Sequence, residues 1–246
     1  MHMQKKIKSP VCFLIFTAAI FVITFLCITL MNAHSSAKTK DASLQPTLTV
    51  IIDAGHGGED GGAIGNKTVY EKDLNLSIAL KIGERLEKSG ISTIYSRTED
   101  ILLYDRNVDY TNRKKALDLA ARVALANKTE NCIFVSIHMN SFPQTQYSGL
   151  QVYYSKNHKD SQNIAQSIQS AVKKTLQPQN NRKITEATSR IYLLDRIQCP
   201  AVLIECGFLS NPEECRLLTT EIYQNQLSEI ISQEIKKYIE KYSQTY

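Results

Sequence analysis

Residues 49–62 read TVIIDAGHGGEDGG, and this stretch sets the expected fold. The β-branched residues at 50–52 predict a short strand that is buried on both faces. Asp53 follows, and glycines then surround a single histidine, His56. Glycine permits a left-handed backbone and lets a ligand approach closely, and open α/β sheets bind ligands beyond the carboxyl ends of their strands. We therefore expect a buried strand that delivers His56 to a binding edge.

Apolar runs and segments of helical periodicity alternate along the rest of the chain. The patterns predict strands at residues 91–95, 132–137, 150–154, 191–194 and 201–204, and helices at residues 70–89, 113–127, 161–176 and 222–242. A further helix should begin at residues 211–214, NPEE, which supply an N-cap, a first-turn proline and two acids. Such alternation produces parallel strands. The predicted fold class is α/β, with a mostly parallel twisted sheet flanked by helices on both faces.

The N-terminus carries a candidate membrane segment. Lys5, Lys6 and Lys8 precede an uncharged apolar run at residues 11–31. At ~1.5 Å per residue, a helix of this length spans roughly the 30 Å core of a bilayer. The preceding lysines favour a cytoplasmic N-terminus, so the rest of the chain should lie outside the cytoplasm.

These features predict three segments. Residues 1–32 are expected to be a signal peptide or a membrane anchor, and the length of the apolar run favours an uncleaved anchor. Residues 33–46 are small and polar and read as a linker, and residues 47–246 should form a single globular domain.

Charge and cysteine content exclude other classes. The chain has 29 Lys and Arg against 24 Asp and Glu, and part of the small excess lies in the N-terminal lysines. This balance does not favour a nucleic-acid partner. Outside the apolar run, the spacing of Cys132, Cys199, Cys206 and Cys215 matches no zinc motif. We expect buried free thiols, because a domain of this size does not need disulfides.

Three of the predicted strands lead to residues that bind metals or move protons. Residues 50–52 lead to His56, the strand at 132–137 to His138, and the strand at 201–204 to Glu205. Parallel strands present their carboxyl ends at one edge, so these side chains should converge. Glu71 begins the first helix, where the helix dipole stabilises a carboxylate. Two histidines and a carboxylate form a catalytic zinc set, and a spare carboxylate can take a proton from water.

The competing interpretation is structural. A histidine at the end of a strand often only closes that strand, and a glutamate at the start of a helix often only stabilises it. Other chemistries fit less well. The glycine turn lacks the third glycine of a dinucleotide loop because Asp60 stands there, and the chain has no GxxxxGK[ST], GxSxG or HExxH motif. Cys206 follows Glu205 directly, so it should point to the opposite face of its strand.

Four motifs resemble one known family. DAGHGG at 53–58, YEKDLNL at 70–76, SIHMN at 136–140 and ECGFLSN at 205–211 are similar to the signatures of zinc-dependent N-acetylmuramoyl-L-alanine amidases. The resemblance implies that His56, Glu71 and His138 bind Zn²⁺ and that Glu205 is the catalytic carboxylate. It implies hydrolysis of the amide between N-acetylmuramic acid and the L-alanine of peptidoglycan stem peptides.

The stretch at 184–211 and the compact, anchored chain resemble a subgroup, the germination-specific amidases of spore-forming bacteria. The subgroup acts on spore cortex peptidoglycan, ahead of muramic-δ-lactam formation. Its glycine turn often reads DPGHGG, whereas this chain has Ala54. The implied location is extracytoplasmic, in the cell envelope around the forespore. A vegetative cell-wall amidase and a non-catalytic, membrane-anchored peptidoglycan-binding module are the alternatives, and an activating protein partner is an open possibility.

Residues 177–189 lack any periodicity and are predicted to form a loop. The loop carries Arg182 and Lys183, and Arg190 follows it. These cations either contact carboxylates of the peptide or belong to a solvated surface.

Overall fold

The computed structural model describes residues 22–29, 48–105, 107 and 110–243. The chain divides into two units, Met1–Gln45 and Pro46–Tyr246. In the first unit the described residues, 22–29, are helical. The rest of the predicted 11–31 segment and the predicted linker at 33–46 lie outside the described residues. Within the described residues, no helix combines the length and the apolar character needed to cross a membrane.

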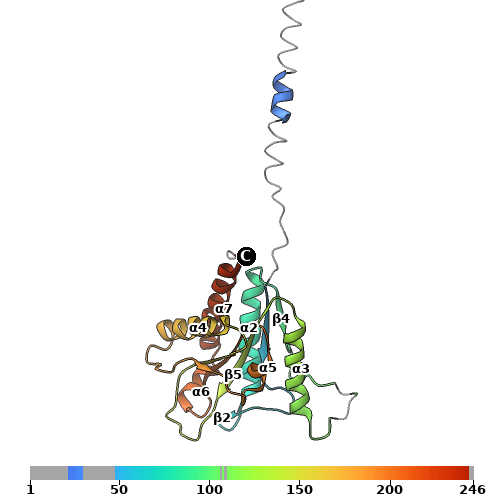
Figure 1. The fold of residues 1–246 in the computed structure, drawn as a ribbon. Coiled ribbons are helices and arrows are strands. Elements are labelled where there is room, and N and C mark those ends of the chain that lie inside the picture. Colours follow the sequence, from blue (N-terminus) through green and yellow to red (C-terminus); the bar gives the residue numbers. More distant parts are fainter. Residues whose placement is uncertain (1–21, 30–47, 106, 108–109, 244–246) are drawn as a thin grey trace, which may run out of the picture. The chain divides into compact units, whose positions relative to one another are not determined.

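The second unit is built on a six-stranded sheet with the strand order β4-β1-β5-β8-β6-β7 (Figure 1). The pairs β4/β1, β1/β5, β5/β8 and β6/β7 are parallel, and β6 runs antiparallel to β8. The strands are β1 (Thr49–Ala54), β4 (Thr93–Tyr95), β5 (Cys132–Asn140), β6 (Gln151–Tyr154), β7 (Thr185–Glu186) and β8 (Ala201–Phe208). The expectation of a mostly parallel sheet is confirmed.

Helices cover both faces of this sheet, as predicted. The helices α2 (Glu71–Lys88), α4 (Asp160–Thr175) and α7 (Glu221–Ser243) contribute to one apolar cluster, and α3 (Lys114–Lys128) and α5 (Tyr192–Arg196) contribute to another. Alternation along β1 explains the two clusters: Val50 and Ile52 belong to the first, and Ile51 belongs to the second. Full burial of each such side chain stabilises the fold by about 1.5–3 kcal/mol.

The helix predicted at NPEE is α6 (Pro212–Leu218). The side chain of Asn211 accepts hydrogen bonds from the backbone N–H groups of Glu213 and Glu214. It therefore caps the helix as expected. Cys132, Cys206 and Cys215 are buried free thiols, and Cys199 is half-buried and also free.

The predicted strand at 191–194 is wrong. The segment forms the short helix α5, whose Leu193 and Leu194 are buried in the second apolar cluster. A short apolar run does not distinguish a strand from a buried helix. The helical form is held by side chains from elsewhere: Ser155 donates to the carbonyl of Leu194, and Asn157 donates to the carbonyls of Leu194, Asp195 and Ile197.

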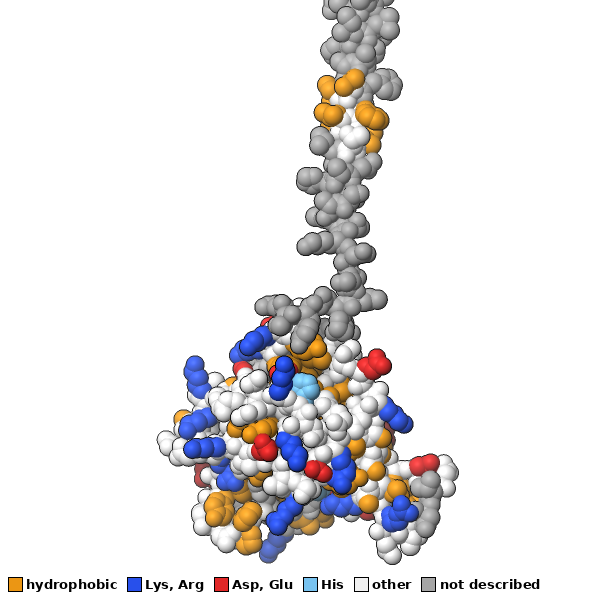
Figure 2. All heavy atoms as spheres, in the orientation of Figure 1, with side chains coloured by type: hydrophobic (Ala, Val, Ile, Leu, Met, Phe, Trp, Pro, Cys, Tyr) orange, Lys and Arg blue, Asp and Glu red, His pale blue; other side chains and the backbone are white. Residues whose placement is uncertain are grey.

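A small antiparallel hairpin, β2 (Ile64–Gly65) and β3 (Val69–Tyr70), was not predicted. It leads directly into α2 and so sets where that helix begins. The predicted loop at 177–189 contains the short strand β7. Basic and acidic side chains are interspersed over the face of the second unit drawn in Figure 2.

Candidate metal centre

The three strands that were predicted to carry site residues are neighbours in the sheet. Ala54 pairs with Ile137, and His138 pairs with Glu205, so the ends of β1, β5 and β8 meet at one edge. His138 and Glu205 lie within their strands, not beyond them. His56 lies beyond β1, in the left-handed conformation with φ 61°. The expectation of convergence at one sheet edge is therefore met by the backbone.

Glu71 reaches this edge from the first residue of α2. Its backbone N–H donates to the carbonyl of Ala63 at 2.9 Å, and its Oε2 accepts from the N–H of Ala63 at 2.8 Å. Its Oε1 accepts from the N–H of Met139 on β5 at 3.1 Å. These bonds turn the carboxylate away from solvent and hold it beside the two histidines.

His56, Glu71 and His138 form a compact group of potential ligands. Glu71 Oε1 lies 3.2 Å from Nε2 of His56 and 2.9 Å from Nδ1 of His138. One donor atom from each of the three lies within 4.8 Å of the other two. The imidazole rings meet edge to face, with centroids 4.9 Å apart. Sequence positions that are far apart thus deliver two nitrogens and one oxygen to one point.

This donor set fits zinc. Ligands about 2.1 Å from a tetrahedral Zn²⁺ lie about 3.4 Å from one another, close to the spacings found here. Two histidines and one glutamate are a catalytic zinc combination that leaves the fourth position for water. Nδ1 of His56 lies 3.0 Å from Oδ2 of Asp60, close enough for an ion pair but not aligned as a hydrogen bond.

The electrostatics favour an ionised Glu71. Burial alone raises the pKa of Glu71, but hydrogen bonds from His138 and His56 outweigh burial and bring the pKa far below its ordinary value. Burial also lowers the pKa of His56, and the carboxylates of Glu71 and Asp60 reverse that effect and raise it. The group therefore concentrates negative charge where a cation would bind.

Glu205 faces the same cavity from β8 in a different environment. The cavity, of about 250 Å³, is lined by His56, His138 and Glu205 together with Arg190 and Tyr192. Oε2 of Glu205 is buried and has no hydrogen-bond partner among the described residues. Burial raises the pKa of Glu205 to about 7; His138 opposes this shift and Glu71 adds to it. Cys206 belongs to the apolar cluster on the opposite face, as predicted.

Two glycines make room for the ligands. A Cβ atom on Gly55 would lie 2.2 Å from Nε2 of His138, and a Cβ atom on Gly62 would lie 2.5 Å from Oε2 of Glu71. Gly62 also has φ 68°, which favours glycine. The glycine-rich turn is thus required by close packing of the ligand side chains.

Arg122 was not among the residues predicted for the site. This buried arginine on α3 pairs with Asp53 and Asp118 and donates to the carbonyls of Ala54 and His56. It ties the turn that carries His56 to the helix on the second face. The signal was present as a charged i,i+4 pair, Asp118 and Arg122, on a helix that packs against the sheet.

The remaining basic residues singled out in the sequence are not among the three potential ligands. Arg190 lines the metal-centre cavity, whereas Arg182 lines a second cavity. Lys183 is exposed. His158 lies 3.9 Å from Asp160 at the start of α4 and is outside the ligand group.

Comparisons with known proteins identify relatives of this chain. A family model described as N-acetylmuramoyl-L-alanine amidase matches residues 50–237. The chain is 33% identical to the germination-specific N-acetylmuramoyl-L-alanine amidase of Bacillus subtilis, over 96% of each chain. It is 42% identical to the CwlD amidase of Clostridioides difficile, solved in complex with the GerS lipoprotein, with a TM-score of 0.74 over 78% of this chain and 98% of that one.

A second solved structure, an N-acetylmuramoyl-L-alanine amidase from Clostridium difficile 630, is 34% identical and has a TM-score of 0.69, over 79% of this chain and 97% of that one. The family model covers most of the second unit, including all four predicted site residues. This chain therefore belongs to the N-acetylmuramoyl-L-alanine amidase family and is an amide hydrolase of that family.

Proposed function

We propose that the protein is a zinc hydrolase that cuts the amide between N-acetylmuramic acid and L-alanine in spore cortex peptidoglycan, ahead of muramic-δ-lactam formation. The observation that carries the proposal is the convergence of His56, Glu71 and His138, with the unpartnered Oε2 of Glu205 in the same cavity. The likeness to the germination-specific amidase of Bacillus subtilis supports the cortex as the site of action.

His56, Glu71 and His138 would hold the metal. When bound there, zinc supplies Lewis acidity towards the amide carbonyl and lowers the pKa of water. Oε2 of Glu205 accepts a proton from water and passes it to the departing amine of L-alanine. A carboxylate with a pKa of about 7 is suited to both transfers, because it can gain and lose a proton near neutral pH. General acid–base catalysis of this kind contributes about 10²–10⁴ in rate.

Location and partners complete the proposal. The apolar run at 11–31, preceded by Lys5, Lys6 and Lys8, supports an extracytoplasmic enzyme, tethered or released. The structure of the CwlD relative with a lipoprotein supports a protein partner for this chain as well. Activity measured with and without envelope extract would reveal an activating partner.

The test is a digestion of purified cortex and vegetative peptidoglycan. Mass spectrometry should detect free stem peptides that begin with L-alanine and glycan strands with unsubstituted muramic acid. A chelator should stop the reaction and zinc should restore it, with about one zinc per chain by elemental analysis, as one three-ligand site requires. Full activity in a sample free of metal would contradict the proposal that zinc is required. Equal or faster digestion of vegetative wall would argue against a cortex role.

A further inference from the structure

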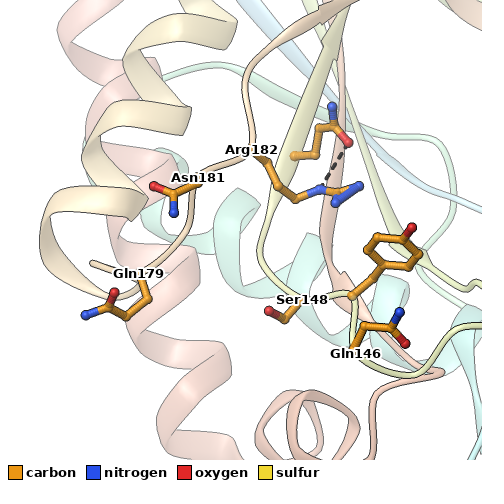
Figure 3. A pocket seen from close by; sticks show the side chains of 7 residues that line it. Gln146, Ser148, Gln179, Asn181 and Arg182 are labelled. Atoms are coloured by element: carbon orange, nitrogen blue, oxygen red, sulfur yellow. Dashed lines mark hydrogen bonds between the residues drawn. The ribbon is translucent and has the colours of Figure 1, made fainter.

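A second cavity, which we call the Arg182 pocket, has a volume of about 480 Å³ and is lined by residues 146–148, Gln151, Gln179, Asn181 and Arg182. Figure 3 shows it between two segments, one carrying Gln146 and Ser148 and the other carrying Gln179, Asn181 and Arg182. One of the lining residues, Gln151, belongs to β6. Among the described residues that line it, Arg182 carries the one charge, and the others present amides or hydroxyls.

Arg182 is held in place through one edge of its guanidinium. Its Nε donates to Oε1 of Gln151 at 3.2 Å, the dashed line in Figure 3. The guanidinium also lies 4.6 Å from the ring centroid of Phe208, which the figure does not draw. Gln151 is itself fixed, because its Nε2 donates to the carbonyl of Lys183 and to Oγ1 of Thr185, both at 3.0 Å. The arginine is therefore oriented before any ligand arrives.

The other edge of the guanidinium is available. Within the described part of the chain, no hydrogen-bond acceptor and no carboxylate within ion-pair distance is found for Nη1 or Nη2 of Arg182. An arginine presents these donors as a rigid fork that matches a carboxylate in a bidentate geometry. Arg182 can therefore bind a carboxylate that enters the pocket.

The pocket adjoins the proposed reaction site. Gln151 pairs with Glu205 across β6 and β8, and Glu205 pairs with His138 across β8 and β5. Directly paired residues project to the same face of a sheet, so Gln151 and Glu205 lie side by side. Neighbouring strands lie about 4.8 Å apart, so Gln151, two strands from His138, lies about 10 Å from it. An extended peptide covers that distance in about three residues, at about 3.3 Å each.

We propose that Arg182 binds a carboxylate carried by the stem peptide two to three residues beyond the cleaved amide, and that the enzyme thereby selects stems with free carboxylates. This inference rests on the proposed amidase reaction, in which the peptide is the leaving group. The hydroxyl of Ser148 and the amide of Asn181 would satisfy the peptide backbone around that carboxylate. Before cleavage the lactyl carboxyl of N-acetylmuramic acid is part of the amide and carries no charge, so the peptide is the part of the substrate that supplies the anion.

The charge of Arg182 also reaches Glu205 and Glu214 and lowers the pKa of both, so its competing role is that of a countercharge for these carboxyls. Glu214 already accepts hydrogen bonds from the backbone N–H groups of Gly149 and Phe208, both at 2.8 Å. A countercharge would act on catalysis whatever the substrate carries. A binding role acts only on substrates that carry the carboxylate, and this difference separates the two.

The experiment compares matched muropeptides that share the muramoyl–L-alanine bond. One carries free carboxylates on the second and third stem residues, and the others are amidated at one of these residues or at both. Steady-state kinetics would be measured on the zinc-loaded full-length protein, its Arg182→Gln and Arg182→Lys variants, and Lys183→Gln as the matched control. Lys183 is the adjacent exposed cation and does not line the pocket.

We expect the wild-type enzyme to prefer the free-carboxylate substrate over the doubly amidated one by about 10- to 100-fold in kcat/KM, the worth of a charge-assisted hydrogen-bond pair. Arg182→Gln should lose this preference, mainly through a higher KM for the free-carboxylate substrate. Arg182→Lys should keep part of the preference, and Lys183→Gln should keep all of it. The singly amidated substrates identify which carboxylate is read.

Two outcomes would overturn the proposal. Equal wild-type kcat/KM for free and amidated substrates would mean that no carboxylate is read. An Arg182→Gln variant that slows on both substrates alike, with a shifted pH profile, would assign Arg182 to the countercharge role. A wild-type enzyme that cleaves neither substrate would instead count against the proposed amidase reaction, so the two failures are distinguishable.

Discussion

Glu71 and Glu205 are identical side chains that meet different surroundings. Glu71 accepts hydrogen bonds from two backbone N–H groups and lies beside two histidines, so its ionised form is stabilised. Glu205 is buried with an unpartnered Oε2, so its protonated form is far easier to reach. An anion that stays ionised is suited to hold a metal, and a carboxyl with a pKa of about 7 is suited to move a proton.

Substitution of each glutamate by glutamine should separate these roles. Glu205→Gln should keep zinc near wild-type occupancy and slow amide cleavage by about 10²–10⁴-fold, because an amide cannot accept the proton. Glu71→Gln should lose zinc, because it removes an anionic ligand. Zinc content and cleavage rate would be measured on both variants in one buffer. If Glu205→Gln released the metal while Glu71→Gln retained it, the two assignments would be exchanged.

The juxtaposition of the candidate site residues could be predicted from sequence because each sits where an element begins or where an apolar strand reaches the sheet edge. His138 and Glu205 end apolar runs, and Glu71 opens a periodic helix. Arg122 was not accessible in the same way, because its partner Asp53 is remote in sequence and only the packing of α3 on the sheet brings them together. The orientation of Arg182 likewise depends on Gln151, a residue on a different strand.

At the scale of elements, the strongly periodic helices and the apolar strands were predicted with small shifts at their ends. The failure at α5 has a local cause: its carbonyls are bonded by Ser155 and Asn157, which no pattern within residues 191–194 reveals. The antiparallel pairing of β6 with β8 was also hidden, because a strand of four residues carries no signal for its direction. That pairing is what places the Arg182 pocket beside Glu205.

The link between β1 and α3 makes a prediction about stability. Burial raises the pKa of Asp53, but Arg122, Ser136 and Ser96 outweigh burial and leave the pKa below its ordinary value. A group whose pKa is lower in the folded state stabilises the protein at pH values above its unfolded-state pKa, which is about 4 for an aspartate. This stabilisation is lost as the pH falls through the pKa of the folded state. At neutral pH, Asp53→Asn should cost about 3–5 kcal/mol, because it leaves Arg122 with a weakened partner in the interior.

The measurement is urea unfolding of wild type and Asp53→Asn from pH 7 to pH 3, in chelator so that metal release does not contribute. The difference in unfolding free energy should be constant at neutral pH and shrink below about pH 4, as wild-type Asp53 becomes protonated too. Glu130→Gln is the control, because Glu130 is exposed at the end of α3. A difference that stays constant down to pH 3 would contradict a stabilising charge on Asp53.

At the scale of the whole molecule, the sheet edge and the glycine turn together hold the charged groups of the site. Gathering such groups costs free energy, because like charges repel and buried charges lose their hydration, and the rest of the fold has to offset that cost. Here the sheet supplies rigid positions for His138 and Glu205, and Arg122 fixes the turn that holds His56. The apolar clusters on both faces stabilise an arrangement that the polar groups alone would not. Among the described residues, the three potential ligands and the residues that line their cavity all belong to the second unit.

The last prediction concerns the three predicted segments of the chain, residues 1–32, 33–46 and 47–246. If residues 1–32 only direct or anchor the protein and residues 33–46 only link it, a chain that begins at residue 47 should fold, bind about one zinc at His56, Glu71 and His138, and cleave soluble muropeptides with unchanged kcat/KM. A reporter fused after Tyr246 should work in the full-length chain only if the reporter requires export, and deletion of residues 1–32 should abolish that activity. Replacing Lys5, Lys6 and Lys8 with glutamate should weaken the orientation, because positive charge on the cytoplasmic side sets it. Activity of a cytoplasm-only reporter on the full-length chain would contradict the orientation, and a truncated chain that folds but no longer binds zinc would contradict the domain boundary.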